Sequence, residues 1–125
     1  MNDKETTIDD LKRMMKEFID ERDWEQYHLP KDVAIALSIE ASEILEHFRF
    51  KNDKEIEEFL RDDKNKEELG DELADTLMFL VDLARVCKID LAEATERKLK
   101  KSAKKYPKDL VKGKSHKYTH YENKE

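Results

Sequence analysis

The chain has 125 residues, of which 45% are charged and 38% hydrophobic, with only two glycines and two prolines. This length suits one domain with a modest core, and the abundance of Ala, Leu, Glu, Lys and Arg predicts an all-α fold. No apolar stretch reaches the roughly 20 residues that span a bilayer, and the polar start lacks a signal-peptide layout, so we expect a cytoplasmic protein without membrane contact.

Cysteine usage limits the kinds of site that the chain can build. Cys87 is the only cysteine, which excludes an intramolecular disulfide and a cysteine-based zinc site. Any metal ion must therefore be held by oxygen or histidine ligands.

The spacing of apolar residues predicts the first half of the chain. A first helix should run from near residue 7 to about residue 27 and end at the His28-Leu29-Pro30 sequence. Pro30 suits the start of a second helix that continues to Phe48 and whose apolar residues make it the expected most buried helix. Residues 51–65 are strongly charged and should form a short surface helix or connector.

A third long helix is expected over about residues 66–86. Its core stripe should consist of Leu69, Leu73, Leu77, Leu80 and Ala84. Asp90 suits the N-cap of a last helix, which the Tyr106-Pro107 pair should end. We therefore expect one domain over residues 1–125, with a helical core over about 7–106 and an extended or partly disordered basic tail over 107–125.

Charge is distributed unevenly along the chain. Residues 97–117 contain ten Lys or Arg and one acid, which gives this segment a net charge of +9. Because the whole chain has a net charge of −6, the rest of it carries −15. A largely acidic chain is a poor candidate for binding a nucleic-acid duplex, whereas a basic segment beside an acidic body suits a small polyphosphate with a metal ion. A solvated basic helix end is the alternative explanation.

Two pairs of acids lie within the two most apolar helices. Glu40 and Glu43 interrupt residues 36–48, and at 100° per residue Glu40 falls in the same sector as apolar core candidates. Glu72 and Asp75 border the third helix's core stripe in the same way. Neither segment has a basic residue nearby to neutralise these acids, so salt bridges explain them poorly. Ionised carboxylates in an apolar setting need cations. Four oxygen ligands suit Mg²⁺, with Mn²⁺ as a substitute.

The same acids carry a resemblance to a known family. Glu40-x-x-Glu43 followed by Glu72-x-x-Asp75 resembles the signature of the MazG-like all-α nucleoside triphosphate pyrophosphohydrolases. The strings ERDWEQYHLPKD, ELAD-TL-FLV, KYP and KYT also resemble the dCTP pyrophosphatase branch of that family. The resemblance extends from about residue 10 to residue 119.

The resemblance implies a four-helix-bundle-like fold that assembles as a homodimer or homotetramer. It implies Mg²⁺ bound by the four acids and hydrolysis of a nucleoside triphosphate to its monophosphate and pyrophosphate. Catalysis is assigned to Glu40 and Glu43, with Glu43 preferred as proton acceptor. Because so small a chain cannot enclose a large cleft, we expect a neighbouring subunit to complete the pocket near Phe48 and Phe50. The implied role is removal of non-standard or excess nucleotides.

Candidate substrate contacts come from both ends of the chain. They are Trp24, His28, Phe50, Phe79, Lys98, Ser102, Lys104, Lys105, Tyr106, Lys117 and Tyr118. Trp24 matches the family position that stacks on the base, and the lysines and tyrosines suit the phosphates. The alternatives are a core role for Trp24, a loop role for His28 and a packing role for Tyr106.

Four positions differ from the pattern of the dCTP-specific branch. Phe50 replaces a tryptophan, Phe79 a tyrosine, Ser102 an asparagine and Met15 a histidine. The loss of these polar groups weakens the case for cytosine as the preferred base. dCTP is still the leading substrate, and modified pyrimidines or broad specificity are the alternatives.

Two other classes of protein were compared with this interpretation. A ferritin-like di-iron bundle needs two Glu-x-x-His pairs, and here only Glu25 and His28 have that spacing, at a helix end. A non-catalytic acidic helical module that binds a partner would show no dependence on a metal ion. Thermal melting with Mg²⁺ and nucleotide distinguishes this second class from an enzyme.

Overall fold

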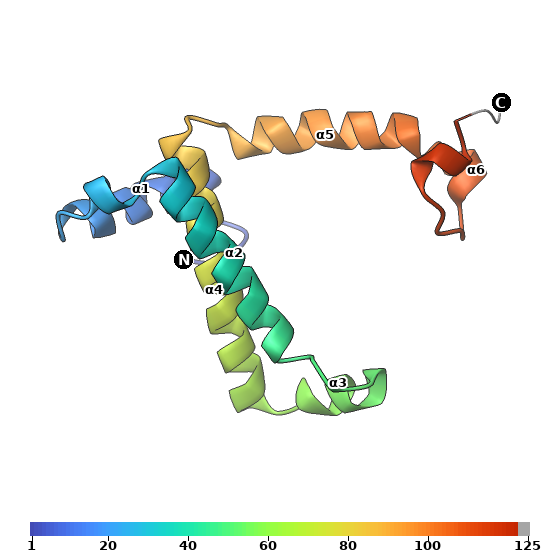
Figure 1. The fold of residues 1–125 in the computed structure, drawn as a ribbon, viewed down its shortest axis with the longest axis horizontal. Helices are drawn as coiled ribbons and strands as arrows, with labels where there is room; N and C mark the ends of the chain where they lie inside the picture. The colour runs from blue at the N-terminus through green and yellow to red at the C-terminus, as the bar shows by residue number, and fades with distance from the viewer. Residues whose placement is uncertain (123–125) are drawn as a thin grey trace. The chain divides into compact units, whose positions relative to one another are not determined.

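The computed structural model of the chain describes residues 1–122, and all regular structure among them is helical (Figure 1). The all-α prediction is confirmed. The described chain forms two compact units, Met1–Ile89 and the segment from Asp90 onward, and each is described by itself. The expectation of one domain over residues 1–125 stays a prediction.

The first unit begins with α1, Ile8–Asp20. Thr7 caps this helix in a capping box: its hydroxyl accepts from the backbone N–H of Asp10, and the Asp10 carboxylate accepts from the backbone N–H of Thr7. The hydrogen bonds from Thr7 lower the pKa of Asp10, with a smaller contribution from Arg13. This sequence pattern therefore fixes where α1 starts.

The predicted end of the first helix, at about residue 27, is wrong. The chain leaves the helix after Asp20, and Asp23 adopts a left-handed conformation with φ of 53°. The backbone N–H of Trp24 then returns to the carbonyl of Ile19 at 3.0 Å, which closes the helix end. A short 3₁₀ turn, η1 (Glu25–Tyr27), follows. A left-handed residue that is not glycine gives little signal in a sequence.

Two long helices form the body of the first unit. Pro30 occupies the first turn of α2 (Pro30–Glu46), and α4 runs over Asp63–Val86 with Asp62 as its N-cap. The short α3 (Asp53–Phe59) connects them, as expected of the charged segment. In Figure 1, α2 and α4 lie side by side and antiparallel. α1 also packs against α4.

Few side chains are fully buried in this unit. They are Ile19, Val33, Val81, Asp82 and Ala84. The expectation that the second helix would be the most buried is wrong, since Val33 is its one buried residue and Ile35 and Ile39 are more than half exposed. The predicted leucine core stripe is also not a core within this chain: Leu73, Leu77 and Leu80 are 50%, 43% and 42% exposed. Of the other two stripe residues, Leu69 is half-buried and Ala84 is buried.

The second unit contains α5, Leu91–Lys105, which Asp90 caps through the backbone N–H of Glu93, as predicted. Beyond Pro107 the chain is more ordered than an extended tail. It forms α6 (Lys108–Val111) and a 3₁₀ turn, η2 (Tyr118–His120), and buries Tyr121. The last three residues of the predicted tail lie outside the described part of the chain.

Among the helices of residues 1–122, none combines the length and the apolar character that a bilayer crossing requires.

Candidate metal and nucleotide site

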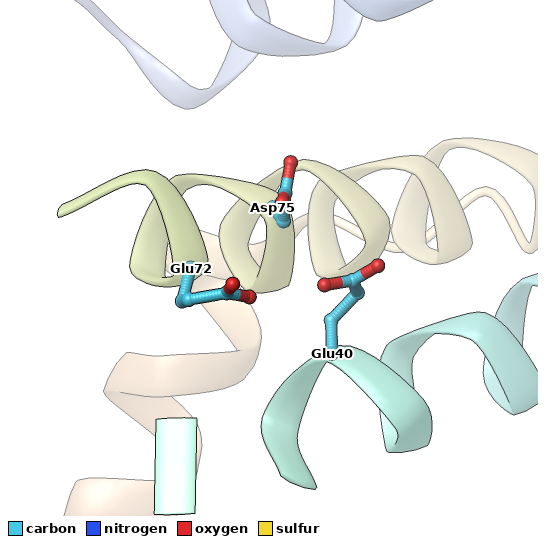
Figure 2. Close-up of side chains that lie close together, drawn as sticks. All are labelled: Glu40, Glu72 and Asp75. Carbon is cyan, nitrogen blue, oxygen red and sulfur yellow. The ribbon is translucent and has the colours of Figure 1, made fainter. Parts of the chain in front are cut away.

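Three acids from two helices meet where α2 faces α4. Glu40 extends from α2 toward Glu72 and Asp75 of α4, as Figure 2 shows. Each acid offers one carboxylate oxygen, and these three oxygens all lie within 4.8 Å of one another. All three residues are half-buried. The spacing of Glu72 and Asp75 places them on the same side of α4. The structure thus brings together three of the four acids that the sequence analysis selected.

The cluster has no neutralising side chain among the described residues. Within residues 1–122, no Lys, Arg or His forms an ion pair with Glu40, Glu72 or Asp75. The Oε2 atom of Glu72 is buried and accepts no hydrogen bond from the described protein. Salt bridging therefore does not explain these acids.

Repulsion within the cluster affects protonation. Burial raises the pKa of Glu40 above its usual 4.5, and the negative charges of Asp75, Glu72 and Glu43 raise it further. An added cation would reverse this effect, because it favours the ionised carboxylate.

These residues fit a hard divalent cation. Carboxylate oxygens are the ligands that Mg²⁺ and Mn²⁺ prefer, and the unpaired buried oxygen of Glu72 provides an acceptor without a donor. The structure thus supports a cation site made of Glu40, Glu72 and Asp75.

Glu43, the fourth predicted ligand, is not part of this group. It lies one turn after Glu40 on α2 and its side chain is exposed. It is near enough to raise the pKa of Glu40. Its roles as ligand and proton acceptor stay predictions.

Trp24 lies just before η1 and is not a core residue. Its side chain is 44% exposed, and its ring meets that of Phe18 edge-on, with 6.1 Å between the centroids. Arg22 covers the Phe18 ring, with its guanidinium carbon 3.7 Å from the centroid. Trp24 therefore presents part of its indole to solvent, as a base-stacking residue must.

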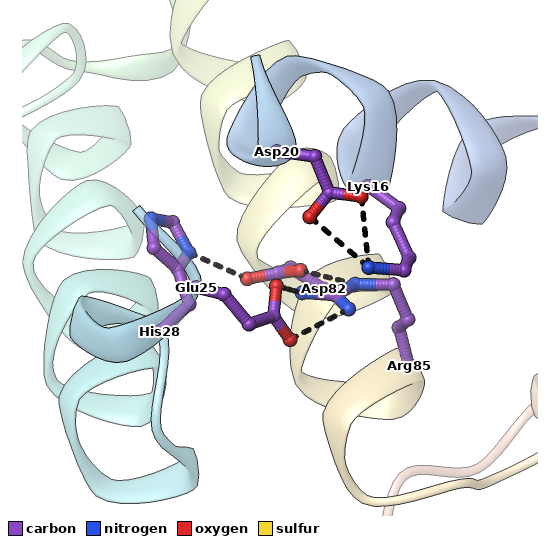
Figure 3. Close-up of polar contacts among 6 residues, drawn as sticks. All are labelled: Lys16, Asp20, Glu25, His28, Asp82 and Arg85. Atoms are coloured by element: carbon purple, nitrogen blue, oxygen red, sulfur yellow. Dashed lines mark hydrogen bonds and ion pairs between the residues drawn. The ribbon is translucent and has the colours of Figure 1, made fainter. Parts of the chain in front are cut away.

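His28 is held by a buried acid that the sequence analysis did not select. Its Nδ1 lies 2.8 Å from Oδ2 of Asp82, and Arg85 Nε donates to Oδ1 of the same Asp82 at 2.8 Å (Figure 3). Arg85 also donates to both carboxylate oxygens of Glu25, at 3.1 Å each. The one available signal was an acid within the apolar sequence FLVDLA.

The two phenylalanines have different settings. Phe79 is half-buried on α4, one turn after Asp75 and on the same face. Phe50 follows α2 in a left-handed conformation with φ of 64°, is 88% exposed, and has the Arg49 guanidinium carbon 4.4 Å from its ring centroid. Within the first unit, nothing buries the Phe50 ring.

The other predicted contacts all lie in the second unit. On α5, Lys98, Ser102 and Lys105 share one face, whereas Lys104 lies about 120° away from Lys98. Lys105 Nζ is 4.6 Å from the ring centroid of Tyr118, which also meets the ring of Tyr106 at 6.5 Å. Lys117 is the exposed N-cap of η2. The structure thus groups Lys105, Tyr106 and Tyr118.

An apolar cavity of about 630 Å³ lies elsewhere in the first unit, between the N-terminal segment, α1 and α4. Met14, Met15 and Met78 are among its lining residues. For residues 1–122, the lining includes neither Trp24 nor any acid of the cluster. This cavity is therefore distinct from the candidate cation site.

Three comparisons show which known proteins this chain is similar to. A family model described as MazG-like matches residues 35–120. The proteins named dCTP pyrophosphatase 1 in Mus musculus and Homo sapiens are 39% and 38% identical to this chain over 115 residues, which is 92% of this chain and 68% of each relative. A crystal structure of a pyrophosphatase from Archaeoglobus fulgidus aligns with a TM-score of 0.75 and 36% identity, covering 86% of this chain and 98% of that one.

Proposed function

Because this chain belongs to the MazG-like family, we propose that it hydrolyses a deoxynucleoside triphosphate to the monophosphate and pyrophosphate, with Mg²⁺ bound at the acid cluster. The family resemblance is confirmed, and the chain is a nucleoside triphosphate pyrophosphatase. The observation that carries the proposed site is the meeting of Glu40, Glu72 and Asp75, with an unpaired buried oxygen on Glu72.

Glu40, Glu72 and Asp75 would hold the cation, with Glu43 as a further ligand. A divalent cation held there would offset the negative charge of the phosphate oxygens. The concentration of acidic charge in the site would repel a triphosphate in the absence of the cation. The requirement for a divalent ion is therefore part of the proposal.

In the reaction, the oxygen of a water molecule forms a bond to the α-phosphorus. The bond from that phosphorus to the bridging oxygen of the β-phosphate breaks, and pyrophosphate leaves with the electron pair. Glu43 is our choice for the carboxylate that accepts the water's proton, because it adjoins the cluster and is exposed to solvent. Glu40 suits this role less well, since its raised pKa favours the protonated form without a cation.

Trp24 is the proposed platform for the base. Its part-exposed indole suits stacking on a nucleobase. His28, Phe50 and Phe79 are further candidate contacts on this side. The two relatives named above are dCTP pyrophosphatases, so dCTP or a modified pyrimidine nucleotide is the leading substrate. Phe79 brings no hydroxyl to the base, which favours broad specificity.

The proposed contacts of the β- and γ-phosphates are basic and phenolic groups of the second unit. They are Lys98, Lys104, Lys105, Tyr106, Lys117 and Tyr118. Ser102 is a further candidate substrate contact, at a position that bears on the choice of base. The grouping of Lys105 with Tyr106 and Tyr118 supports this proposal, because it combines a cation with two hydroxyl donors.

We also propose that the protein works as a homodimer or homotetramer. Leu73, Leu77 and Leu80 form an apolar stripe on α4, which we name the leucine stripe, and they remain 42–50% exposed in the single chain. Contiguous apolar surface on a long helix is typical of an interface between protein chains. A second copy that covers the leucine stripe would supply the core that one chain lacks.

The test is an end-point assay of purified, chelator-stripped protein against a panel of dNTPs and NTPs, with and without Mg²⁺. Metal-dependent release of monophosphate and pyrophosphate, lost in Glu43→Gln, supports the reaction and ranks the bases. Asp71→Asn, an exposed acid on α4 outside the cluster, should retain activity and serves as the control. No turnover of any triphosphate would favour a non-catalytic helical module.

A further inference from the structure

Asp82 is the one charged side chain among residues 1–122 that is fully buried. Burial of an ionised carboxylate is costly unless each oxygen has a partner. Both oxygens have one here, since Oδ2 pairs with His28 Nδ1 and Oδ1 with Arg85 Nε, each at 2.8 Å. The cation cluster does not include Asp82.

Arg85 extends the same network to the residue after Trp24. Its two terminal nitrogens donate to the two carboxylate oxygens of Glu25 at 3.1 Å, a bidentate geometry that fixes direction as well as distance. Burial disfavours the charged guanidinium, but the hydrogen bonds to Glu25 and Asp82 outweigh it and raise the pKa of Arg85. Arg85 therefore stays charged, and Figure 3 shows the continuous network from Glu25 to His28.

The network holds both ends of a short segment. Glu25 is the first residue of the 3₁₀ turn η1 and His28 follows its last residue, and their partners lie one turn apart on α4. Without these contacts, Trp24 would retain its backbone hydrogen bond to Ile19 and its edge contact with Phe18. The side-chain contacts to α4 therefore add a direct link between the Trp24 segment and the helix that carries two of the clustered acids.

Helix geometry relates this network to the cation cluster. Asp75 and Asp82 are seven residues apart and thus share a face of α4, separated by roughly 10 Å along the axis at 1.5 Å per residue. Half-buried Phe79 lies between them on that face. One rigid helix thus carries acids of the cluster at one level and the anchor of the Trp24 segment at another.

We propose that Asp82 is a positioning residue for nucleotide binding: with His28, Arg85 and Glu25, it holds the segment 24–28 on α4 and so fixes the Trp24 ring at a set distance from the cation cluster. This inference rests on the proposed function, in which Trp24 stacks on the base. Asp82 itself touches neither the substrate nor the reacting atoms. A buried ion pair contributes little net stability compared with apolar residues, which makes a positional role the better account of its presence.

The test uses Trp24 as a reporter, because it is the only tryptophan of the chain. The variants are Asp82→Asn, which removes the buried charge, and Glu25→Gln, which breaks the pairing with Arg85 at a partly exposed position. Glu57→Gln is the matched control, since it breaks an exposed pair between Glu57 on α3 and Arg61, which follows that helix. Acrylamide quenching of Trp24 emission is measured without nucleotide, and KM and kcat are measured with dCTP and Mg²⁺.

Quenching should rise in Asp82→Asn and Glu25→Gln and stay at the wild-type level in Glu57→Gln. KM should increase about tenfold in Asp82→Asn and less in Glu25→Gln, with kcat within about threefold of wild type, because misplacement of a binding group affects substrate binding first. Unchanged quenching and KM in both variants would overturn the proposal, as would a fall in kcat with KM unchanged.

Two further outcomes can be told apart from a failure of this proposal. If Asp82→Asn does not fold, Glu25→Gln alone decides, since it leaves the buried pairs of Asp82 in place. If the wild-type protein hydrolyses no triphosphate, the proposed function fails, and quenching of Trp24 then decides whether the network fixes the segment.

Discussion

Glu40 on α2 and Asp75 on α4 belong to different helices, yet a carboxylate oxygen of one lies within 4.8 Å of a carboxylate oxygen of the other, and an oxygen of Glu72 lies within the same limit of both. A second carboxylate at this distance favours protonation of one of the pair. Burial adds to the effect at Glu40, whose pKa is raised. In the absence of a cation, this cluster therefore opposes folding at neutral pH.

The first prediction concerns pH and Glu40. Between its usual pKa of 4.5 and the raised value in the fold, Glu40 keeps a proton that the unfolded chain has lost. The stability of the metal-free protein should therefore fall as pH rises through that window, with full stability from this group below 4.5. Glu40→Gln removes the titration, so its metal-free Tm should exceed that of wild type above the window. Melts in chelator at several pH values measure the difference, and a variant that melts below wild type throughout would contradict the prediction.

The second prediction concerns the cation at Asp75. Mg²⁺ at about a hundredfold excess over its Kd should stabilise the wild-type protein by about 2.7 kcal/mol. Asp75→Asn should lose most of this gain and lower kcat/KM on the order of 100-fold, because a bound metal ion contributes several kcal/mol of charge stabilisation. Melting with and without Mg²⁺ measures the first effect. Asp71→Asn is the control on the same helix, and an equal loss there would show that overall charge causes the effect.

The third prediction concerns the leucine stripe. Leu77→Glu places a charge at a position that is 43% exposed in one chain but buried in the proposed assembly. It should shift the protein to monomers in gel filtration with light scattering, because a buried unpaired charge is costly. Lys54→Gln on α3 makes the same change in net charge without touching the stripe. Monomeric wild-type protein with full activity would rule out the assembly.

The fourth prediction concerns Trp24. Trp24→Ala should cost roughly 1–3 kcal/mol of nucleotide binding, the range measured for loss of a stacked aromatic residue, and should raise KM with little change in kcat. Trp24→Phe should retain part of the affinity, since a smaller ring still stacks. Initial rates measured over a range of concentrations of each dNTP give the KM and kcat of each variant. A KM for Trp24→Ala equal to that of wild type would show that the base binds elsewhere.

Sequence periodicity predicted the acid cluster because helical rotation alone decides which side chains share a face. The spacing of Glu72 and Asp75 was enough to place them on one face of a helix, and the apolar residues in the same sector were enough to select Glu40. The same periodicity identified the leucine stripe as apolar but does not specify whether another helix of the chain or a second chain covers it. The network of Asp82, His28 and Arg85 joins residues from separate segments through the left-handed turn at Asp23, which local patterns do not encode.

The fifth prediction compares the two glycines. Gly70 lies within α4, and a Cβ added there meets nothing within 4 Å. Gly70→Ala should therefore raise the free energy of unfolding by about 1 kcal/mol, because alanine loses less backbone entropy in a helix. Gly113→Ala has equal space but a φ of +76°, so strain should make it destabilising. Denaturant melts of both variants measure these opposite signs. If Gly70→Ala instead destabilises the protein, a second chain approaches α4 at this point, which would extend the interface beyond the leucine stripe.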